Sequence, residues 1–350
     1  MSKKNHLQIL HIVPLTLLST LFMPGCQSYP GADLREEVPA SSPTVTLSLH
    51  AEAVESPQQG RASIDESALT PGSSTVFRWD AGDRVMLWMG EAQTPCIFST
   101  PEGGTYAASF TYTGPAVETD RYFGFYPASE RKETTQSLYI PTDGTVRQEL
   151  PDHSMHLGRY RAMYTESITG RSGETTLEKI IFKPLTSLVV FKISNESGTA
   201  VSYSSVTLET SVCTASGNSQ PVFYSHATYT AGSGAKEVTL PSSPTDHSVT
   251  LSLGKEKGIP VASGNTFHAF LPLFPSASLT DSPLQLRITT DAGKTITRSF
   301  PGSLLRSISS FRTGLFYLFH IRHTPSDELS ITLPTISGWE AGGEVELTVD

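Results

Sequence analysis

Apolar side chains recur at every second position in one segment of this chain after another, and this period of two most constrains its fold. Residues 45–53 place Val, Leu, Leu, Ala and Ala at alternate positions, and residues 344–350 alternate in the same way. Such alternation is typical of a strand with one buried and one exposed face. No stretch of ten or more residues carries a convincing 3.6-residue apolar period. The chain is therefore predicted to be all β.

Further strand-like segments follow at short spacing, separated by Gly and Pro turns as in β-sandwiches. They are residues 75–79, 84–88, 105–113, 122–126, 136–140, 160–165, 204–208, 222–229, 236–240, 248–253, 265–273, 284–289, 295–300, 315–321 and 329–333. Between two of them, residues 291–294 are predicted to form a tight hairpin turn. Only 17% of the residues are charged, which suits strands and turns better than long surface helices.

The N-terminus has the order of a secretory signal. Two lysines precede an apolar run from about Leu7 to Met23, which is followed by Gly25 and Cys26. This ending resembles a bacterial lipoprotein signal, in which a small residue precedes a cysteine that receives lipid and becomes the mature N-terminus. Cys26 is accordingly predicted to be the lipidation site, with residues 1–25 as the signal peptide.

Two alternatives to the lipoprotein interpretation stay open, an ordinary signal peptide and an uncleaved membrane helix. Met23 and Pro24 depart from the usual lipoprotein pattern. A membrane-spanning helix needs about 20 apolar residues, whereas this run is interrupted by His11, Pro14 and several hydroxyls. The length argument favours the lipoprotein and places the rest of the chain outside the cytoplasm.

Beyond the signal, about 325 residues exceed what one hydrophobic core usually holds, which predicts two domains. Residues 26–61 contain a polar tether and the first strand. Residues 180–193 form a nearly continuous apolar run that is predicted to be buried on both faces. Pro184 cannot donate a hydrogen bond in a strand ladder and is predicted to split this run. The predicted domains are residues 62–183 and 184–350.

Net charge and cysteines exclude several classes of function. The formal net charge of −9 leaves no basic stripe for nucleic acid and argues against direct binding to an anionic lipid surface. Cys96 and Cys213 fall in different predicted domains, so small buried side chains are favoured over a disulfide between them.

The search for chemistry returns no enzyme site, no cofactor site and no metal site. Gly293-Lys294-Thr295 lacks the first glycine of a phosphate loop, and no G-x-S-x-G nucleophile motif is present. His153 and His156 have no carboxylate at ligand spacing, and His320 and His323 would lie on opposite faces of a strand.

Two aspartates and three tryptophans can be interpreted either as functional or as structural residues. Asp80 and Asp83 could be paired carboxylates, but a turn between two strands explains both. Trp79, Trp88 and Trp339 could line a carbohydrate site, although burial in a core is favoured.

The order of several segments resembles the fimbrillin-like (FimA/Mfa1-like) pilin proteins of Bacteroidales. The likeness covers nearly the whole mature chain. It rests on the lipoprotein ending, the early alternating strand, an Arg-containing loop, and the segments Phe77–Val85, Phe182–Ile193, Gly314–Ile321 and Trp339–Gly343.

This resemblance implies two tandem transthyretin-like β-sandwich domains in a fimbrial subunit of the outer membrane and cell surface. It also implies that an arginine-specific protease removes the first strand, after which a strand from the next subunit fills the vacated groove. Carried over to this chain, cleavage follows Arg61, with Arg35 as the second choice, and the donor strand comprises Val345, Leu347 and Val349. A solvated loop arginine and an ordinary last strand explain these residues equally well.

The partners implied are other fimbrial subunits, either copies of this chain or accessory pilins, and the outer membrane through the lipid on Cys26. An alternative is a non-polymerising outer-membrane lipoprotein that serves as a fimbrial anchor or as an adhesin for host protein or glycan. An enzyme on a β scaffold is a third hypothesis, but it would require an acid pair that the sequence does not display.

Overall fold

Strands make up most of the structure, a computed structural model that describes residues 44–52, 79–90, 94–104, 107–115, 121–128, 133–165, 168–169, 176–211, 219–232, 238–280, 282–332 and 334–338. Within these ranges there is one α-helix, α1 (Gly302–Ile308), and one 3-10 helix, η2 (Met155–Arg159). Neither is long and apolar enough to cross a membrane. The prediction of an all-β chain is confirmed for this part of the protein.

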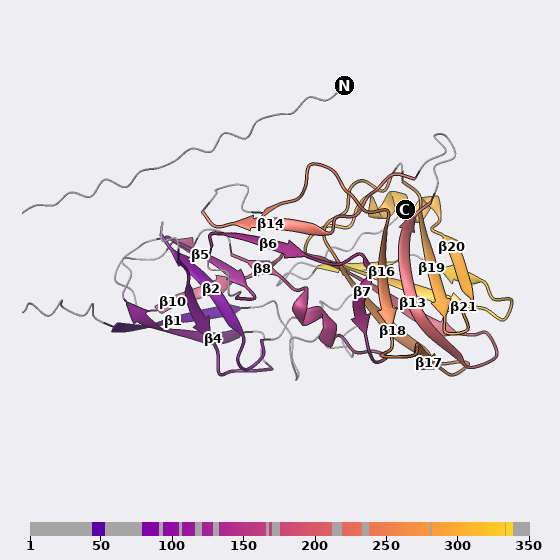
Figure 1. Cartoon of the computed structure of the whole chain (residues 1–350), viewed down its shortest axis with the longest axis horizontal. Coiled ribbons are helices and arrows are strands. Elements are labelled where there is room, and N and C mark those ends of the chain that lie inside the picture. Colours follow the sequence, from indigo (N-terminus) through magenta and orange to yellow (C-terminus); the bar gives the residue numbers. More distant parts are fainter. Residues whose placement is uncertain are drawn as a thin grey trace, which may run out of the picture. The chain divides into compact units, whose positions relative to one another are not determined.

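Sheet I collects nine strands from the first half of the chain (Figure 1). Neighbours pair in the order β10-β1-β4-β3-β2-β5-β8-β11, and β9 pairs with β5. The bounds are β1 Thr44–Glu52, β2 Arg84–Met89, β3 Cys96–Ser99, β4 Ala107–Pro115, β5 Arg121–Tyr126, β8 Met163–Tyr164, β9 Ile168–Thr169, β10 Thr176–Ile181 and β11 Lys183–Pro184.

Strand β2 is buried on both of its faces. Val85 and Leu87 belong to an apolar cluster, the N-terminal core, which also contains Trp79, Met89, Phe98, Ala108, Phe110, Tyr122, Tyr126, Met163, Ile180 and Phe182. Met86 and Trp88 alternate with them and pack in a second cluster with Tyr229. Trp79 and Trp88 are therefore core residues, as the sequence favoured.

Sheets II and III contain β7 and the strands from β12 onward, apart from β14 and β15. Sheet II has the order β18-β12-β21-β22, with β23 also paired to β21, and sheet III has the order β20-β19-β13-β16-β7, with β17 paired to β13. The bounds are β7 Asp143–Gln148, β12 Ser187–Asn195, β13 Val201–Thr210, β16 Ser248–Leu253, β17 Ile259–Val261, β18 Thr266–Leu273, β19 Leu284–Thr290, β20 Thr295–Ser299, β21 Leu315–His323, β22 Leu329–Ile331 and β23 Thr335–Gly338.

Strand β12 confirms the prediction of burial on both faces. Val189, Phe191 and Ile193 enter the large apolar cluster that sheets II and III share. Leu188 and Val190 point the other way and pack against Leu157 of η2. The strand break predicted at Pro184 is also present, because β11 ends there and β12 begins at Ser187.

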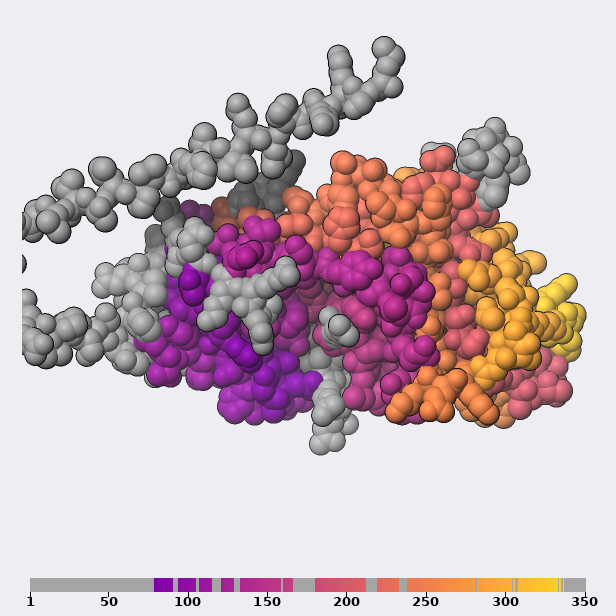
Figure 2. Space-filling view, in the orientation of Figure 1, coloured from indigo at the N-terminus to yellow at the C-terminus, as the bar shows by residue number. Residues whose placement is uncertain are grey.

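Strands from the two sides of the predicted domain boundary pair with each other. Strand β6 (Thr135–Tyr139) pairs with β14 (His226–Thr230), which also pairs with β15 (Val238–Thr239), and these three strands form sheet IV. Strand β7 pairs in parallel with β16. In Figure 2 the magenta surface of the earlier residues borders the orange surface of the later ones. The boundary at residues 183 and 184 stays a prediction.

The hairpin predicted at residues 291–294 is confirmed. Strands β19 and β20 pair in register through it, Thr290 N–H donates to Lys294 O at 2.9 Å, and Gly293 has the positive φ of 76° that the turn requires. Strands β3, β7, β9, β17 and β23 were not predicted, and each is six residues or shorter.

We expect Phe191→Ala to lower the free energy of unfolding by about 3–5 kcal/mol, because Phe191 is fully buried between sheets II and III and the substitution leaves a cavity. Urea unfolding followed by circular dichroism measures the change. Leu150→Ala is the matched control, because Leu150 is 57% exposed and its loss should cost less than about 0.5 kcal/mol. Equal effects of the two substitutions would contradict this assignment of the core.

Candidate functional site

Strand β1 lies between β10 and β4 in sheet I. Among the described residues, these two strands have no other strand in common as a partner. It pairs antiparallel with β4 over nine residues, from Thr44 opposite Pro115 to Glu52 opposite Ala107. On its other side it pairs parallel with β10, with a register shift between Leu49 and Ala51. Figure 1 shows β1 beside β4 and β10. The strand predicted from the alternation at residues 45–53 is confirmed.

Both neighbours of β1 depend on it for pairing. Strand β10 has no other partner in sheet I within the described residues, and β4 keeps only the contact of Thr111 with Ser99 of β3. Unpaired backbone N–H and C=O groups along a sheet edge form a template for another strand. Removing β1 would therefore leave two edges without their partner, one of nine residues on β4 and one of six residues on β10.

The position of β1 also borders the N-terminal core. Opposite residues of an antiparallel pair lie on the same face of a sheet, and the register places Ala51 opposite Ala108 and Leu49 opposite Phe110. Ala108 and Phe110 are fully buried, and the Phe110 ring packs edge-on against Trp79 at 4.9 Å between centroids. A strand at this position therefore helps to cover a fixed apolar surface.

Tyr112 follows Ala108 and Phe110 at the next alternate position of β4 and lies opposite Leu47. Its ring lies 5.4 Å from that of Phe98, and its hydroxyl contacts Cys96. Burial, together with this contact, raises the pKa of Tyr112 to about 12. Burial also raises the pKa of the Cys96 thiol. Cys96 is a half-buried free thiol, as the sequence favoured, while Cys213 lies outside the described residues.

The aspartate pair forms the turn that the sequence indicated. Asp83 N–H donates to Asp80 O, and the Asp83 carboxylate accepts from Asp80 N–H at 2.8 Å and from the Tyr126 hydroxyl at 3.0 Å. Gly82 has a positive φ of 89° at the corner. Burial raises the pKa of Asp83, and the two hydrogen bonds partly offset this rise.

Arg161 is the partner of this turn that the sequence did not reveal. It is 3% exposed and lies close to Asp80, Asp83 and Tyr126. Burial lowers the pKa of Arg161 to about 10, which these neighbours oppose. Arg161 stays positively charged at neutral pH and balances buried negative charge.

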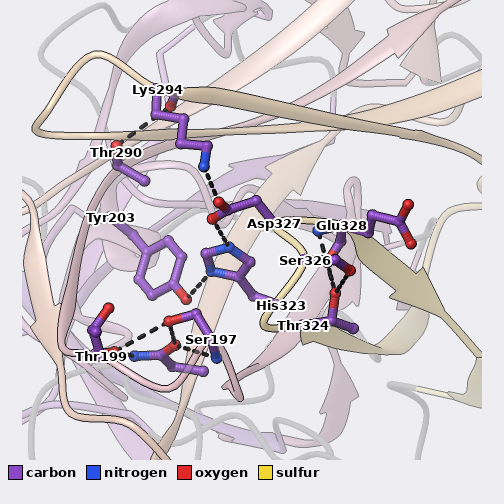
Figure 3. Close-up of polar contacts among 11 residues, drawn as sticks. Ser197, Thr199, Tyr203, Thr290, Lys294, His323, Thr324, Ser326, Asp327 and Glu328 are labelled. Atoms are coloured by element: carbon purple, nitrogen blue, oxygen red, sulfur yellow. Dashed lines mark hydrogen bonds and ion pairs between the residues drawn. The ribbon is translucent and has the colours of Figure 1, made fainter.

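A second polar cluster joins sheets II and III (Figure 3). The Tyr203 hydroxyl lies 2.9 Å from His323 Nδ1, and His323 Nε2 lies 3.2 Å from Asp327 Oδ1. Asp327 also forms an ion pair with Lys294. Because a carboxylate can only accept, the neutral form of the His323 imidazole donates from Nε2 to Asp327 and accepts the hydrogen bond of the Tyr203 hydroxyl at Nδ1.

The order of hydroxyl, imidazole and carboxylate resembles that of a hydrolase triad, but its burial excludes that role. Tyr203 has no exposed surface and His323 is 1% exposed. Burial raises the pKa of Tyr203 above its usual range, so the hydroxyl stays protonated. Tyr203 comes from sheet III and His323 from sheet II, and the cluster therefore links the two sheets.

In the described part of the chain, no group of three or more His, Cys, Asp or Glu side chains is placed to hold a metal ion. His156 Nε2 lies 2.7 Å from Phe270 O, and burial lowers the pKa of His156 to about 4. His320 is half-buried on a face of sheet II, whereas His323 points to Tyr203, as the strand alternation predicted.

The residues predicted to be processed or donated lie outside the described residues. These are Cys26, Arg35, Arg61, Val345, Leu347 and Val349, together with Trp339. What the structure adds to those predictions is the position of β1 itself.

No protein-family model and no curated protein matches the sequence. Solved structures do match. A proposed cell adhesion protein from Bacteroides ovatus has a TM-score of 0.56 and 13% identity and covers 87% of this chain and 100% of its own. One from Bacteroides uniformis has a TM-score of 0.52 and 13% identity and covers 84% of this chain and 98% of its own. The tip fimbrial protein Mfa3 from Porphyromonas gingivalis, solved with a C-terminal truncation, has a TM-score of 0.45 and 10% identity and covers 85% of this chain and 100% of its own.

The two Bacteroides structures establish the fold of this chain. The similarity runs over more than four-fifths of the sequence at 13% identity. The resemblance noted from the sequence is thus confirmed for the fold, and the function has to be argued from the chain itself.

We expect Tyr203→Phe to lower the free energy of unfolding by about 1–3 kcal/mol, because it leaves a buried imidazole nitrogen without its hydrogen bond. Thermal or urea unfolding measures the loss. Tyr139→Phe removes the same hydroxyl from a residue that is 63% exposed and should have no effect. If both substitutions are neutral, the hydroxyl does not stabilise the contact between the sheets.

Proposed function

We propose that the chain is a structural subunit of cell-surface fimbriae that assembles by donor-strand exchange at the position of β1 and mediates adhesion. The observation that carries this proposal is the pairing of β1 with both β4 and β10, two strands that share no other partner in the described part of sheet I. Main-chain hydrogen bonds on both sides give affinity to any strand placed there, and alternate side chains over the core fix its register.

The position of β1 in the chain makes it removable. It ends at Glu52, and the next described residue is Trp79, so Arg61 falls in the connection that ties β1 to the rest of sheet I. A cut after Arg61 changes an intramolecular strand into a separate peptide and removes the effective concentration that the connection supplied. A strand from another subunit can then compete for the groove.

The C-terminal segment is the proposed donor. Val345, Leu347 and Val349 alternate with polar residues, as Val45, Leu47 and Leu49 do in β1. This common spacing would let the segment take the register of β1 with its apolar positions on one face.

We expect the mature surface protein to begin at Ala62, because cleavage after Arg61 frees the lipid on Cys26 and β1 together. N-terminal sequencing and intact-mass analysis of the isolated protein measure this. Arg61→Ala should keep the precursor N-terminus and prevent multimers, and Arg35→Ala should have no effect. Multimers built from chains that keep β1 would contradict the proposal.

We expect deletion of residues 344–350 to give a folded protein that no longer forms multimers, because the groove of the next subunit then receives no strand. Circular dichroism checks the fold and size-exclusion chromatography with light scattering checks assembly. Leu347→Asp should act like the deletion, whereas Thr348→Ser should assemble normally because it keeps the alternation. Undiminished multimers after the deletion would exclude this segment as the donor.

The lipoprotein-type ending at Gly25-Cys26 favours a second candidate, an outer-membrane lipoprotein that keeps its lipid. Such a protein would serve as a fimbrial anchor or as an adhesin for host protein or glycan. A blocked, lipidated Cys26 on the mature protein supports this candidate, and a free Ala62 supports the polymerising subunit.

A further inference from the structure

Strand β18 is the outer strand of sheet II, with β12 as its strand neighbour. Outer strands leave a row of backbone N–H and C=O groups that can pair with another chain. Buried backbone groups also need partners of some kind. The question for β18 is therefore what satisfies the groups that face away from β12.

A glutamine side chain supplies two of these partners. Gln148 is fully buried at the end of β7; its Nε2 donates to His268 O at 2.7 Å, and its Oε1 accepts from Phe270 N–H at 2.9 Å. One donor and one acceptor on the same side chain reproduce the pair of bonds that a residue of a neighbouring strand would make.

Asp152 and His156 supply the other two. Asp152 Oδ1 accepts from His268 N–H and from His268 Nδ1, both at 2.7 Å. His156 Nε2, in its neutral form, donates to Phe270 O at 2.7 Å. The outward N–H and C=O groups of His268 and Phe270 are thus all occupied, and Pro272, two residues along, has no N–H to offer.

The charge state of these groups fits this arrangement. Burial alone would raise the pKa of Asp152, but the hydrogen bonds from the His268 side chain and backbone lower it below its ordinary value. The carboxylate is therefore ionised at neutral pH. Burial lowers the pKa of His156 to about 4, which keeps its imidazole neutral.

The segment that carries these side chains is fixed at both ends. At its start, β7 pairs with β16, and Gly254 N–H donates to Gln148 O at 2.8 Å. At its far end, Leu157 is 1% exposed and packs on the face of sheet II with Val190 and Phe270. Residues 148–156 therefore cross the β18 edge between two anchors.

We infer that residues 148–156, the β18 strap, form an autoinhibitory contact that occupies the β18 edge in place of a partner strand and prevents a second copy of this chain from pairing there. The occupant excluded is β18 of another copy, because like strands pair antiparallel in a closed two-fold dimer. The strap thereby confines strand addition to the β1 position, a role that rests on the proposed function.

The test uses the chain from residue 27 onward with Arg61→Ala, so that β1 stays attached and exchange at β1 does not run. The result of this test is therefore the same whether or not the chain assembles by strand exchange at β1. Gln148→Leu with Asp152→Ala removes three of the four side-chain hydrogen bonds to the β18 backbone, together with the bond of Asp152 to the His268 ring. Asp152→Ala alone is the milder variant if the double substitution unfolds the protein.

In dilute protein, we expect the amides of His268 and Phe270 to exchange about tenfold faster in the double variant, measured by hydrogen exchange. At high concentration, we expect sedimentation to show dimers and these amides to become protected again. Asp152→Asn keeps an oxygen that can accept from His268 N–H and should stay monomeric. Asp143→Ala, on β7 but outside the β18 contact, is the matched control.

Two results would overturn the inference. Amides of β18 that stay as protected in the variants as in the parent chain would show that the strap does not hold this edge. Variants with faster exchange that remain monomeric at all concentrations would show that the open edge does not recruit a second copy.

Discussion

Backbone N–H and C=O groups along a strand edge need hydrogen-bond partners. Three sheets of this protein supply these partners in different ways. In sheet I, β1 satisfies β4 and β10 at once. In sheet III, β7 lies along β16. In sheet II, side chains of Gln148, Asp152 and His156 replace a strand on β18. The cost of burying an unpaired N–H or C=O group explains why these three positions are filled.

These closures differ in how they can be released. Strand β1 is reached by one connection, residues 53–78, so one break in that connection separates it from the rest of the fold. The β18 strap lies in the middle of the chain between β7 and η2, each of which is held by its own contacts. A single cut there would leave both flanking elements in place. One closure can therefore be separated from the fold by a single chain break and the other cannot, and we expect this difference to limit where a second chain can join.

The elements that could be predicted from the sequence are strands in which apolar residues recur at regular positions. Alternation at residues 45–53 indicated β1, and the apolar run at 188–193 indicated a strand buried on both faces. Strand β7 was not predicted, because Val146 is its one apolar residue and the segment shows no alternation. It is a strand because it pairs with β16. Gln148, Asp152 and Arg161 were missed for a related reason, since their partners lie far away in the sequence. The turn at Asp80–Asp83 was predicted because its bonds are local.

The buried polar clusters among the described residues hold elements of the fold together. Tyr203, His323 and Asp327 link two sheets, and Asp83 with Tyr126 fixes a turn. If function instead depends on main-chain pairing over an apolar surface, only strand length, alternation and the shape of the groove need to persist. Side chains elsewhere can then vary widely, which is consistent with a fold shared at 13% identity with Bacteroides structures. Strand exchange as proposed for β1 depends on backbone pairing and on alternation, which many different sequences can supply.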